Sequence, residues 1–200
     1  MLVTLSHLLR AYKFPNLTAG CYNINMFSNP EQNILKLGLR EGMRVADLGS
    51  GTGAYSLSAS KHVGHTGHIY AIEVQKGLVK KFESEIKEVG STNIECIWGD
   101  IEKKNGTKIA DHSMDAVIIA NVLFQAEDKL GLIDEAKRIL KKGGKILFID
   151  WNTSPRGMGP SPFDVVPEDV AKDLFIKRGF KLQEKITTSE HHYGIIFTHE

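Results

Sequence analysis

The chain has 200 residues, 42% of them hydrophobic and 24% charged, which is the composition of one globular domain with at most a small appendage. Its formal charge of +1 and pI of about 7.8 provide no general attraction to nucleic acid or to an anionic membrane. No apolar run reaches the roughly 18 residues of a membrane span and the two cysteines lack a metal-ligand spacing, so we expect a cytoplasmic protein without a metal site.

The first predicted element is a short helix that begins at Pro30. Asn29 is placed to cap it, Pro30 suits its first position, and Gln32 completes a capping box. Gly38 is expected to end it. We therefore expect a domain over residues 29–200, preceded by an N-terminal lid or cap segment over residues 1–28.

Extended and helical patterns then alternate along the chain. The predicted strands cover residues 43–48, 68–74, 93–99, 114–121 and 145–151. Between and after them, helices are expected from the glycine turn to about residue 62 and over residues 76–89, 127–140 and 167–178. One face of the helix over 127–140 is expected to carry Leu130, Ile133, Ala136, Ile139 and Leu140. A loop rich in proline and glycine is expected over residues 152–167.

The C-terminal pattern is of a different kind. Residues 180–187 and 192–199 are both extended and are separated only by a short polar turn, so they must pair antiparallel. With five preceding β-α units, the sequence predicts an α/β fold with a doubly wound, mostly parallel seven-stranded sheet and an antiparallel C-terminal hairpin.

Three glycines, Gly49, Gly51 and Gly53, follow the first strand directly in the run VADLGSGTGAYS. They allow positive φ and let backbone N–H groups face a ligand at a helix N-terminus. The spacing satisfies the dinucleotide fingerprint G-x-G-x-x-G/A, and Glu73 follows Gly49 by 24 residues, close to the distance of a ribose-binding acid. On this pattern alone a nicotinamide dinucleotide remains an alternative.

Acidic residues at neighbouring strand ends favour a different ligand. Asp47, Glu73 and Asp100 fall at the ends of the first three predicted strands. A pyrophosphate would be repelled by three acids, whereas S-adenosylmethionine offers an amino group, a ribose diol and an adenine amine without any phosphate. Each hydrogen bond to a charged acceptor contributes roughly 1.5–3 kcal/mol.

At these residues the chain resembles the class I S-adenosylmethionine-dependent methyltransferases. The resemblance is carried by VADLGSGTG, IYAIEVQ, GDIE, MDAVIIANVLFQAED and LKKGGKILFIDW, and it extends from about residue 29 to the C-terminus. It implies the strand order 3-2-1-4-5-7-6 and S-adenosylmethionine as the cofactor.

The cofactor-binding residues that the resemblance implies lie at strand ends or in the turns after them: Asp47, Gly49, Ser50, Gly51, Thr52, Gly53, Glu73, Val74, Asp100, Ile101 and Asn121. Asp47 would lie beside the methionine amino group, Glu73 would bind the ribose hydroxyls, and Asp100 would accept from the adenine amine. Val74 would flank the adenine, and Asn121 would lie near the sulfonium. For Asp100 and Asn121 the alternative is a turn or helix cap.

The acceptor is expected to be a small molecule that is methylated on oxygen or carbon. The chain resembles small relatives of the ubiquinone and menaquinone methyltransferases in FSNPEQNILKLGL, NVLFQAED and DWNTSPRGMGP, although Gln125 stands where many relatives have histidine. The substrate-side candidates are Tyr22, Met26, Phe27 and Trp151. No catalytic residue is assigned, since positioning alone can supply much of the rate.

Three further features leave alternatives open. His191, His192 and Tyr193 would either supply a base or belong to the surface of an edge strand. The function itself has two alternatives, an NAD(P)-dependent oxidoreductase and a non-catalytic binding subunit with a methyltransferase fold. A small-molecule substrate is expected as partner, without nucleic acid, for a monomer or a homodimer.

Overall fold

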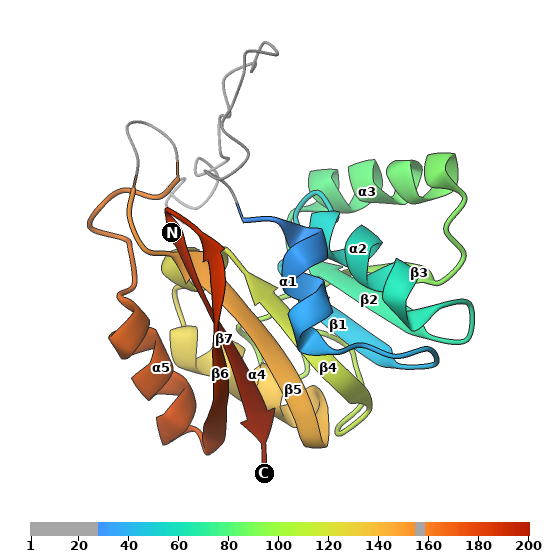
Figure 1. The fold of residues 1–200 in the computed structure, drawn as a ribbon. Helices are drawn as coiled ribbons and strands as arrows, with labels where there is room; N and C mark the ends of the chain where they lie inside the picture. The colour runs from blue at the N-terminus through green and yellow to red at the C-terminus, as the bar shows by residue number, and fades with distance from the viewer. Residues whose placement is uncertain (1–27, 155–158) are drawn as a thin grey trace, which may run out of the picture.

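A computed structural model describes residues 28–154 and 159–200 and shows one seven-stranded sheet with the order β3-β2-β1-β4-β5-β7-β6 (Figure 1). The strands are β1 (Arg44–Leu48), β2 (His68–Glu73), β3 (Ile94–Trp98), β4 (Met114–Ala120), β5 (Leu140–Trp151), β6 (Phe180–Ser189) and β7 (His192–His199). Strands β1 to β5 pair parallel, and β7 pairs antiparallel with both β5 and β6. The predicted fold class and strand order are confirmed.

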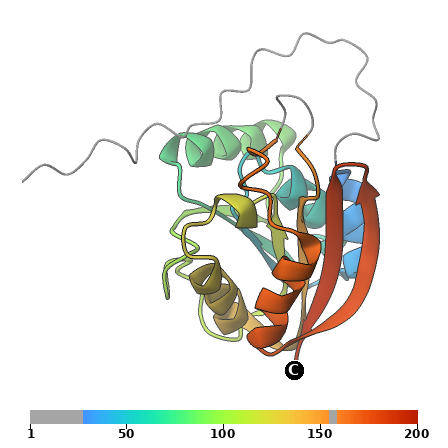
Figure 2. The same ribbon diagram turned by 90° about the vertical axis from the view of Figure 1, so that its left-hand side faces the viewer.

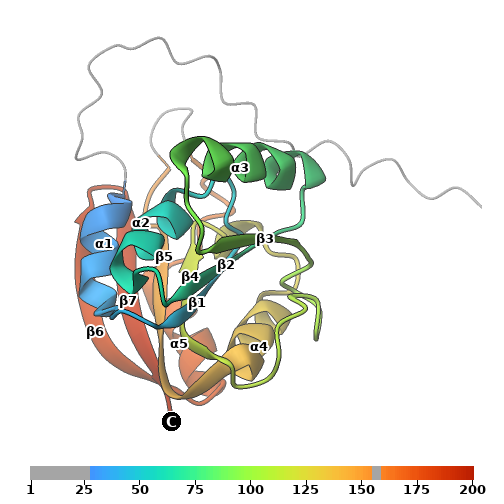
Figure 3. The ribbon, with the colours of Figure 1, turned by 90° about the vertical axis from the view of Figure 1, so that its right-hand side faces the viewer.

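Helices cover both faces of this sheet. They are α1 (Pro30–Leu37), α2 (Ala54–Val63), α3 (Lys76–Val89), α4 (Lys129–Ile139) and α5 (Glu168–Lys177), with a short 3-10 helix, η3 (Leu123–Gln125), after β4. Buried side chains of α1, α2 and α3 pack on one face, and those of α4 and α5 pack on the other. Figures 2 and 3 show these two helical layers on opposite sides of the sheet. No helix of the described residues has the length and apolar character of a membrane span.

The first helix begins and ends where local signals place it. The Asn29 side chain accepts from the Gln32 amide at 3.3 Å, and Pro30 occupies the first turn. Gly38 closes the helix with φ of 70°, and its N–H donates to the Leu35 carbonyl. The two caps satisfy backbone groups that would otherwise be unpaired at the start and at the end of α1.

Two expectations about α4 and β5 were wrong. The helix begins at Lys129, after an Asp128 cap, and ends at Ile139, because Leu140 is already extended with ψ of 134°. A buried stripe at helical spacing then runs through Leu132 rather than Leu130, which is 40% exposed. Residues 140–144 join β5 through a register shift against β4 instead of forming a separate turn.

The parallel strands bring their carboxyl ends to one edge of the sheet. Because β7 is antiparallel to β5, its first residue lies at the same edge, where His192 is paired with Trp151. The turns after β1, β2, β3 and β4 and the start of β7 therefore surround one place. In open α/β sheets ligands bind at this carboxyl edge of the sheet, the ligand edge.

Candidate functional site

The glycine turn lies between β1 and α2. Gly49, Gly51 and Gly53 have φ of 78°, 54° and 84°, as predicted. A Cβ at Gly53 would overlap the Phe82 ring, and one at Gly49 would approach Val122 Cγ2 to 2.6 Å. At Gly51 the same position meets only the Gly49 carbonyl oxygen, at 4.0 Å. The turn is therefore packed at its two ends and open at Gly51.

The rest of this turn is held by the neighbouring strand. The amides of Gly49 and Ser50 both donate to the Ile72 carbonyl oxygen, at 2.9 and 3.0 Å. Thr52 is exposed. The turn thus keeps its shape through β2 while one side chain of the predicted set faces away from the protein interior.

Glu73 lies at the end of β2 and contacts this turn directly. Its Oε2 accepts from the Gly51 amide at 3.1 Å, its Oε1 accepts from the Gln75 amide at 2.8 Å, and the residue is only 6% exposed. Each carboxylate oxygen can accept more than one hydrogen bond. The geometry leaves acceptor capacity at the open position of the turn, which suits a diol.

Asp47 is buried on the face of β1 that packs against α2. Its Oδ2 accepts from Ser56 Oγ at 2.6 Å. Burial raises the pKa of Asp47 to about 6, the hydrogen bonds of Ser56 oppose this, and the neighbouring Glu73 adds to it. A cation beside such a carboxyl would favour its charged form. The site is therefore electrostatically suited to an amino group.

The adenine-side candidates follow β2 and β3. Asp100 Oδ1 accepts from the Glu102 amide at 3.0 Å, so the turn-cap alternative describes one of its oxygens. Ile101 is buried, and its Cδ1 lies 3.6 Å from where a Gly49 Cβ would be. Val74 is 57% exposed beside them. The turns after β1, β2 and β3 thus converge, as the sequence predicts.

Asn121 follows β4 in a conformation that L residues rarely adopt, with φ of 59°. Its Oδ1 is buried and has no hydrogen-bond partner among the described residues. Leaving a buried acceptor unpaired costs about 1–3 kcal/mol. The Asn121 Oδ1 therefore caps no backbone group among the described residues and is free to accept from a ligand at this edge.

Asp150, at the end of β5, belongs to this edge but was not among the predicted site residues. Its Oδ2 accepts from the Phe124 amide at 3.1 Å, and its Oδ1 accepts from the Trp151 amide at 2.8 Å. Burial raises the pKa of Asp150 to about 7, against the effect of these amides. Its place as an acid at a parallel strand end, FID, was the signal that could have revealed it.

The substrate-side candidates divide into two groups. Trp151 is buried, and its ring centroid lies 4.1 Å from that of His192. Tyr22, Met26 and Phe27 lie outside the described residues. For His192 and Tyr193 the edge-strand alternative is wrong, since β7 lies between β5 and β6, whereas His191 lies in the turn before β7.

His192, at the start of β7, and His191, in the turn before it, therefore lie at the same edge of the sheet as the carboxyl end of β5. Burial lowers the pKa of His192 to about 4, so its ring is neutral at physiological pH. His191 Nδ1 lies 2.7 Å from Thr153 Oγ1, whereas the Tyr193 hydroxyl donates to the Val166 carbonyl oxygen. Among the described residues, no group of three His, Cys, Asp or Glu side chains could hold a metal ion.

Comparison with known proteins places this geometry in context. Residues 39–194 match a family model described as a methyltransferase domain. An arsenite methyltransferase from Homo sapiens is 35% identical over 120 residues, covering 57% of this chain and 32% of that protein. The ubiquinone/menaquinone biosynthesis C-methyltransferase UbiE from Haemophilus ducreyi is 28% identical over 116 residues, covering 58% of this chain and 44% of that protein.

Solved structures are similar over more of the chain. The crystal structure of a SAM dependent methyltransferase from Aquifex aeolicus has a TM-score of 0.78 at 27% identity and covers 86% of this chain and 89% of that one. The match to the two curated relatives, in contrast, spans less than half of their length.

Proposed function

The chain belongs to the family of S-adenosylmethionine-dependent methyltransferases, and from this premise we propose that it transfers a methyl group to a small-molecule acceptor. S-adenosylmethionine is the cofactor of this family, which removes the nicotinamide alternative. The observation that carries the proposal is the carboxylate of Glu73, which accepts from the Gly51 amide at 3.1 Å where the glycine turn is open.

We propose that the cofactor lies along the carboxyl edge of β1 to β4. Glu73 would accept from the ribose hydroxyls, and Asp47 would attract the methionine amino group. Asp100 would accept from the adenine amine with its second oxygen, beside the exposed Val74. Asn121 would direct its buried Oδ1 toward the sulfonium end. The bound cofactor supplies an electrophilic methyl group, and these residues orient it.

Methyl transfer is an in-line displacement, in which the acceptor nucleophile bonds to the methyl carbon as the carbon–sulfur bond breaks. Holding the two reactants aligned can supply roughly 7–11 kcal/mol of the barrier. An oxygen or carbon nucleophile would approach from the side of Trp151, and the neutral His192 lies within the same wall. We also propose that residues 1–28 form a lid over the acceptor.

The described residues offer little to an arsenite acceptor, although an arsenite methyltransferase is among the relatives; the second cysteine, Cys21, lies outside them. Arsenite is thiophilic, and thiolates bind such soft elements. In the part of the chain that the structure describes, the cysteine is Cys96, in β3 at the far edge of the sheet. Burial, with Glu83 and Glu95 nearby, raises the pKa of this thiol to about 11. It is therefore a protonated thiol away from β4 and β5.

Thermal melts with S-adenosylhomocysteine, S-adenosylmethionine, NAD and NADP test the cofactor site. A ligand at 100 times its dissociation constant adds roughly 2.7 kcal/mol, or about 5–11 °C at this chain length. Shifts with the two sulfur compounds alone support the proposal. Methyl from labelled cofactor should then enter the small-molecule fraction of a cell extract, and label only in RNA or protein would refute the acceptor class.

A further inference from the structure

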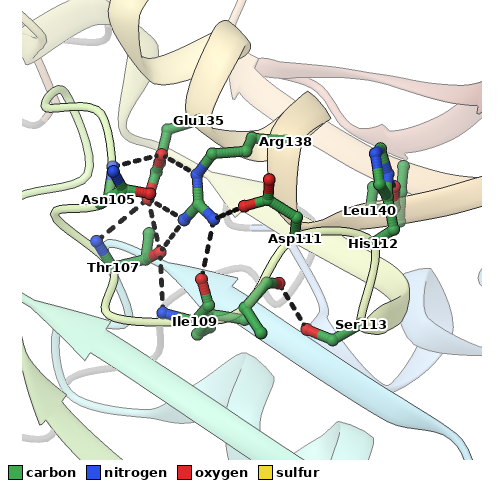
Figure 4. A network of polar contacts seen from close by, with 10 residues as sticks. Asn105, Thr107, Ile109, Asp111, His112, Ser113, Glu135, Arg138 and Leu140 are labelled. Carbon is green, nitrogen blue, oxygen red and sulfur yellow. Dashed lines mark hydrogen bonds and ion pairs between the residues drawn. The ribbon is translucent and has the colours of Figure 1, made fainter.

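The loop between β3 and β4, residues 99–113, carries Asp100 but contains no helix or strand of its own. A single carboxylate on α4, that of Glu135, holds its middle (Figure 4). Glu135 accepts from the Asn105 amide at 2.9 Å, from the Thr107 amide at 3.1 Å and from Thr107 Oγ1 at 2.5 Å. Its side chain is fully buried. The loop therefore follows the position of this one carboxylate.

Arg138 completes the contact from the next turn of α4. Its Nε and Nη2 each lie 2.7 Å from one oxygen of Glu135, and its Nη1 donates to the Ile109 carbonyl oxygen and to Asp111. Burial alone would raise the pKa of Glu135, but hydrogen bonds from Arg138, Thr107 and Asn105 outweigh it and lower that pKa. The carboxylate is thus ionised and fixed from both sides.

The held segment packs directly under Asp100. Gly106, between the two residues that donate to Glu135, accepts from the Asp100 amide at 3.2 Å. A Cβ at Gly106 would overlap the Asp100 carbonyl oxygen, and one at Gly99 would lie 2.5 Å from the Gly106 carbonyl oxygen. Backbone lies against backbone here with no room for a methyl group. A shift of Gly106 must therefore move Asp100.

We propose that Glu135 is a positioning residue for adenine recognition, which sets Asp100 through the backbone of Gly106. The inference rests on the proposed function, in which Asp100 accepts from the adenine amine. Glu135 lies on α4 beneath the loop and touches no proposed ligand atom. Its effect should therefore appear in the choice between purines and not only in stability.

The test compares two ligands by calorimetry: S-adenosylhomocysteine, and S-inosylhomocysteine, which has a carbonyl oxygen in place of the adenine amine. An amine that donates to Asp100 should bind about 10–150-fold more tightly than this analogue. Glu135→Gln keeps the shape but loses the charge and one acceptor. We expect the preference to fall at least about fivefold, a change equivalent to about 1 kcal/mol, while Asp134→Asn, an exposed neighbour paired with Arg178, leaves it unchanged.

Further variants separate the possible failures. Thr107→Val removes the hydroxyl that donates to Glu135 and accepts from Arg138 Nη2 and the Ile109 amide. It should lower the preference in the same direction if Glu135→Gln does not fold. An unchanged preference in the folded variants overturns the positioning role, provided that Asp100→Asn abolishes it. If Asp100→Asn has no effect, or the wild type does not bind, the adenine role of Asp100 fails first and the inference fails with it.

Discussion

Substitution of Glu73 by glutamine is the most direct test of the cofactor site, because this carboxylate holds the glycine turn and is the acceptor that we propose for the ribose. One oxygen accepts from the Gly51 amide and the other from the Gln75 amide, at 3.1 and 2.8 Å. Glutamine has nearly the same shape but offers one acceptor oxygen, and its NH₂ group can only donate. Glu73→Gln therefore leaves one backbone amide facing a donor.

The magnitudes follow from these contacts. An unsatisfied group at a position that is 6% exposed should lower the free energy of unfolding by about 1–3 kcal/mol. Loss of a charged acceptor for one ribose hydroxyl should cost about 1.5–3 kcal/mol of binding, which weakens S-adenosylhomocysteine about 10–150-fold. The two effects are separable, since the first needs no ligand.

Isothermal calorimetry measures the binding, and urea unfolding of the ligand-free protein measures the stability. Glu95→Gln is the matched control, because Glu95 lies on the adjacent β3 with its side chain 57% exposed. It should leave both quantities unchanged. A folded Glu73→Gln protein whose dissociation constant stays within about twofold of wild type would refute the assignment of the ribose to Glu73.

Three further outcomes follow from the same geometry. Gly53→Ala should destabilise the protein by several kcal/mol in urea unfolding, roughly as an overpacked core does, because its Cβ would overlap the Phe82 ring. Gly51→Ala should cost only about 1 kcal/mol, since no neighbouring atom lies close to its Cβ. Equal losses of stability in the two variants would contradict the conclusion that the turn is open at Gly51. Burial holds the pKa of Asp47 at about 6, and the amino group of bound S-adenosylhomocysteine should lower it. Binding between about pH 5 and 7 should therefore release protons, which calorimetry detects as a heat that depends on the buffer. Asp47→Asn should abolish this release. The pKa of Asp150 is about 7 in the folded protein against a usual 3.8, so the folded state binds the carboxyl proton more tightly than the unfolded state does. The stability that the protonated carboxyl contributes is therefore fully present below about pH 4 and is lost as the pH rises toward 7. Urea unfolding should show Asp150→Asn gaining about 2 kcal/mol relative to wild type between about pH 5 and 7, and parallel pH curves for the two proteins would refute the burial argument.

The sequence predicts what is encoded over short distances. Asn29 and Gly38 act within one helical turn of the residues they cap, and the positive φ of the glycine turn is a local property. Of the face predicted for α4, Ile133, Ala136 and Ile139 are buried as expected, whereas Leu130, in the first turn after the Asp128 cap, is 40% exposed. Periodicity thus predicts the middle of this helix better than its first turn.

Contacts between distant segments could not be predicted in the same way. Glu135 bonds residues that precede it by about 30 positions, and Asp150 bonds an amide 26 positions earlier. Both read as ordinary acids in the sequence, one on a helix and one at a strand end. Their partners are backbone amides, which carry no signature in the residue type. Only the folded sheet brings these groups together.

These carboxylates share one arrangement with Glu73. Three turns at this edge are held through backbone amides by an acid of another element: Glu73 of β2 holds the glycine turn, Glu135 of α4 holds the loop after β3, and Asp150 of β5 holds the 3-10 turn after β4. Irregular loops held in this way lose little conformational freedom when a ligand binds, so less of the interaction energy goes to ordering them. Methyl transfer gains from the same rigidity, because its rate depends on the alignment of two reactants. Under the proposed function the chain therefore needs no assigned base, provided that these acids keep the three turns in place.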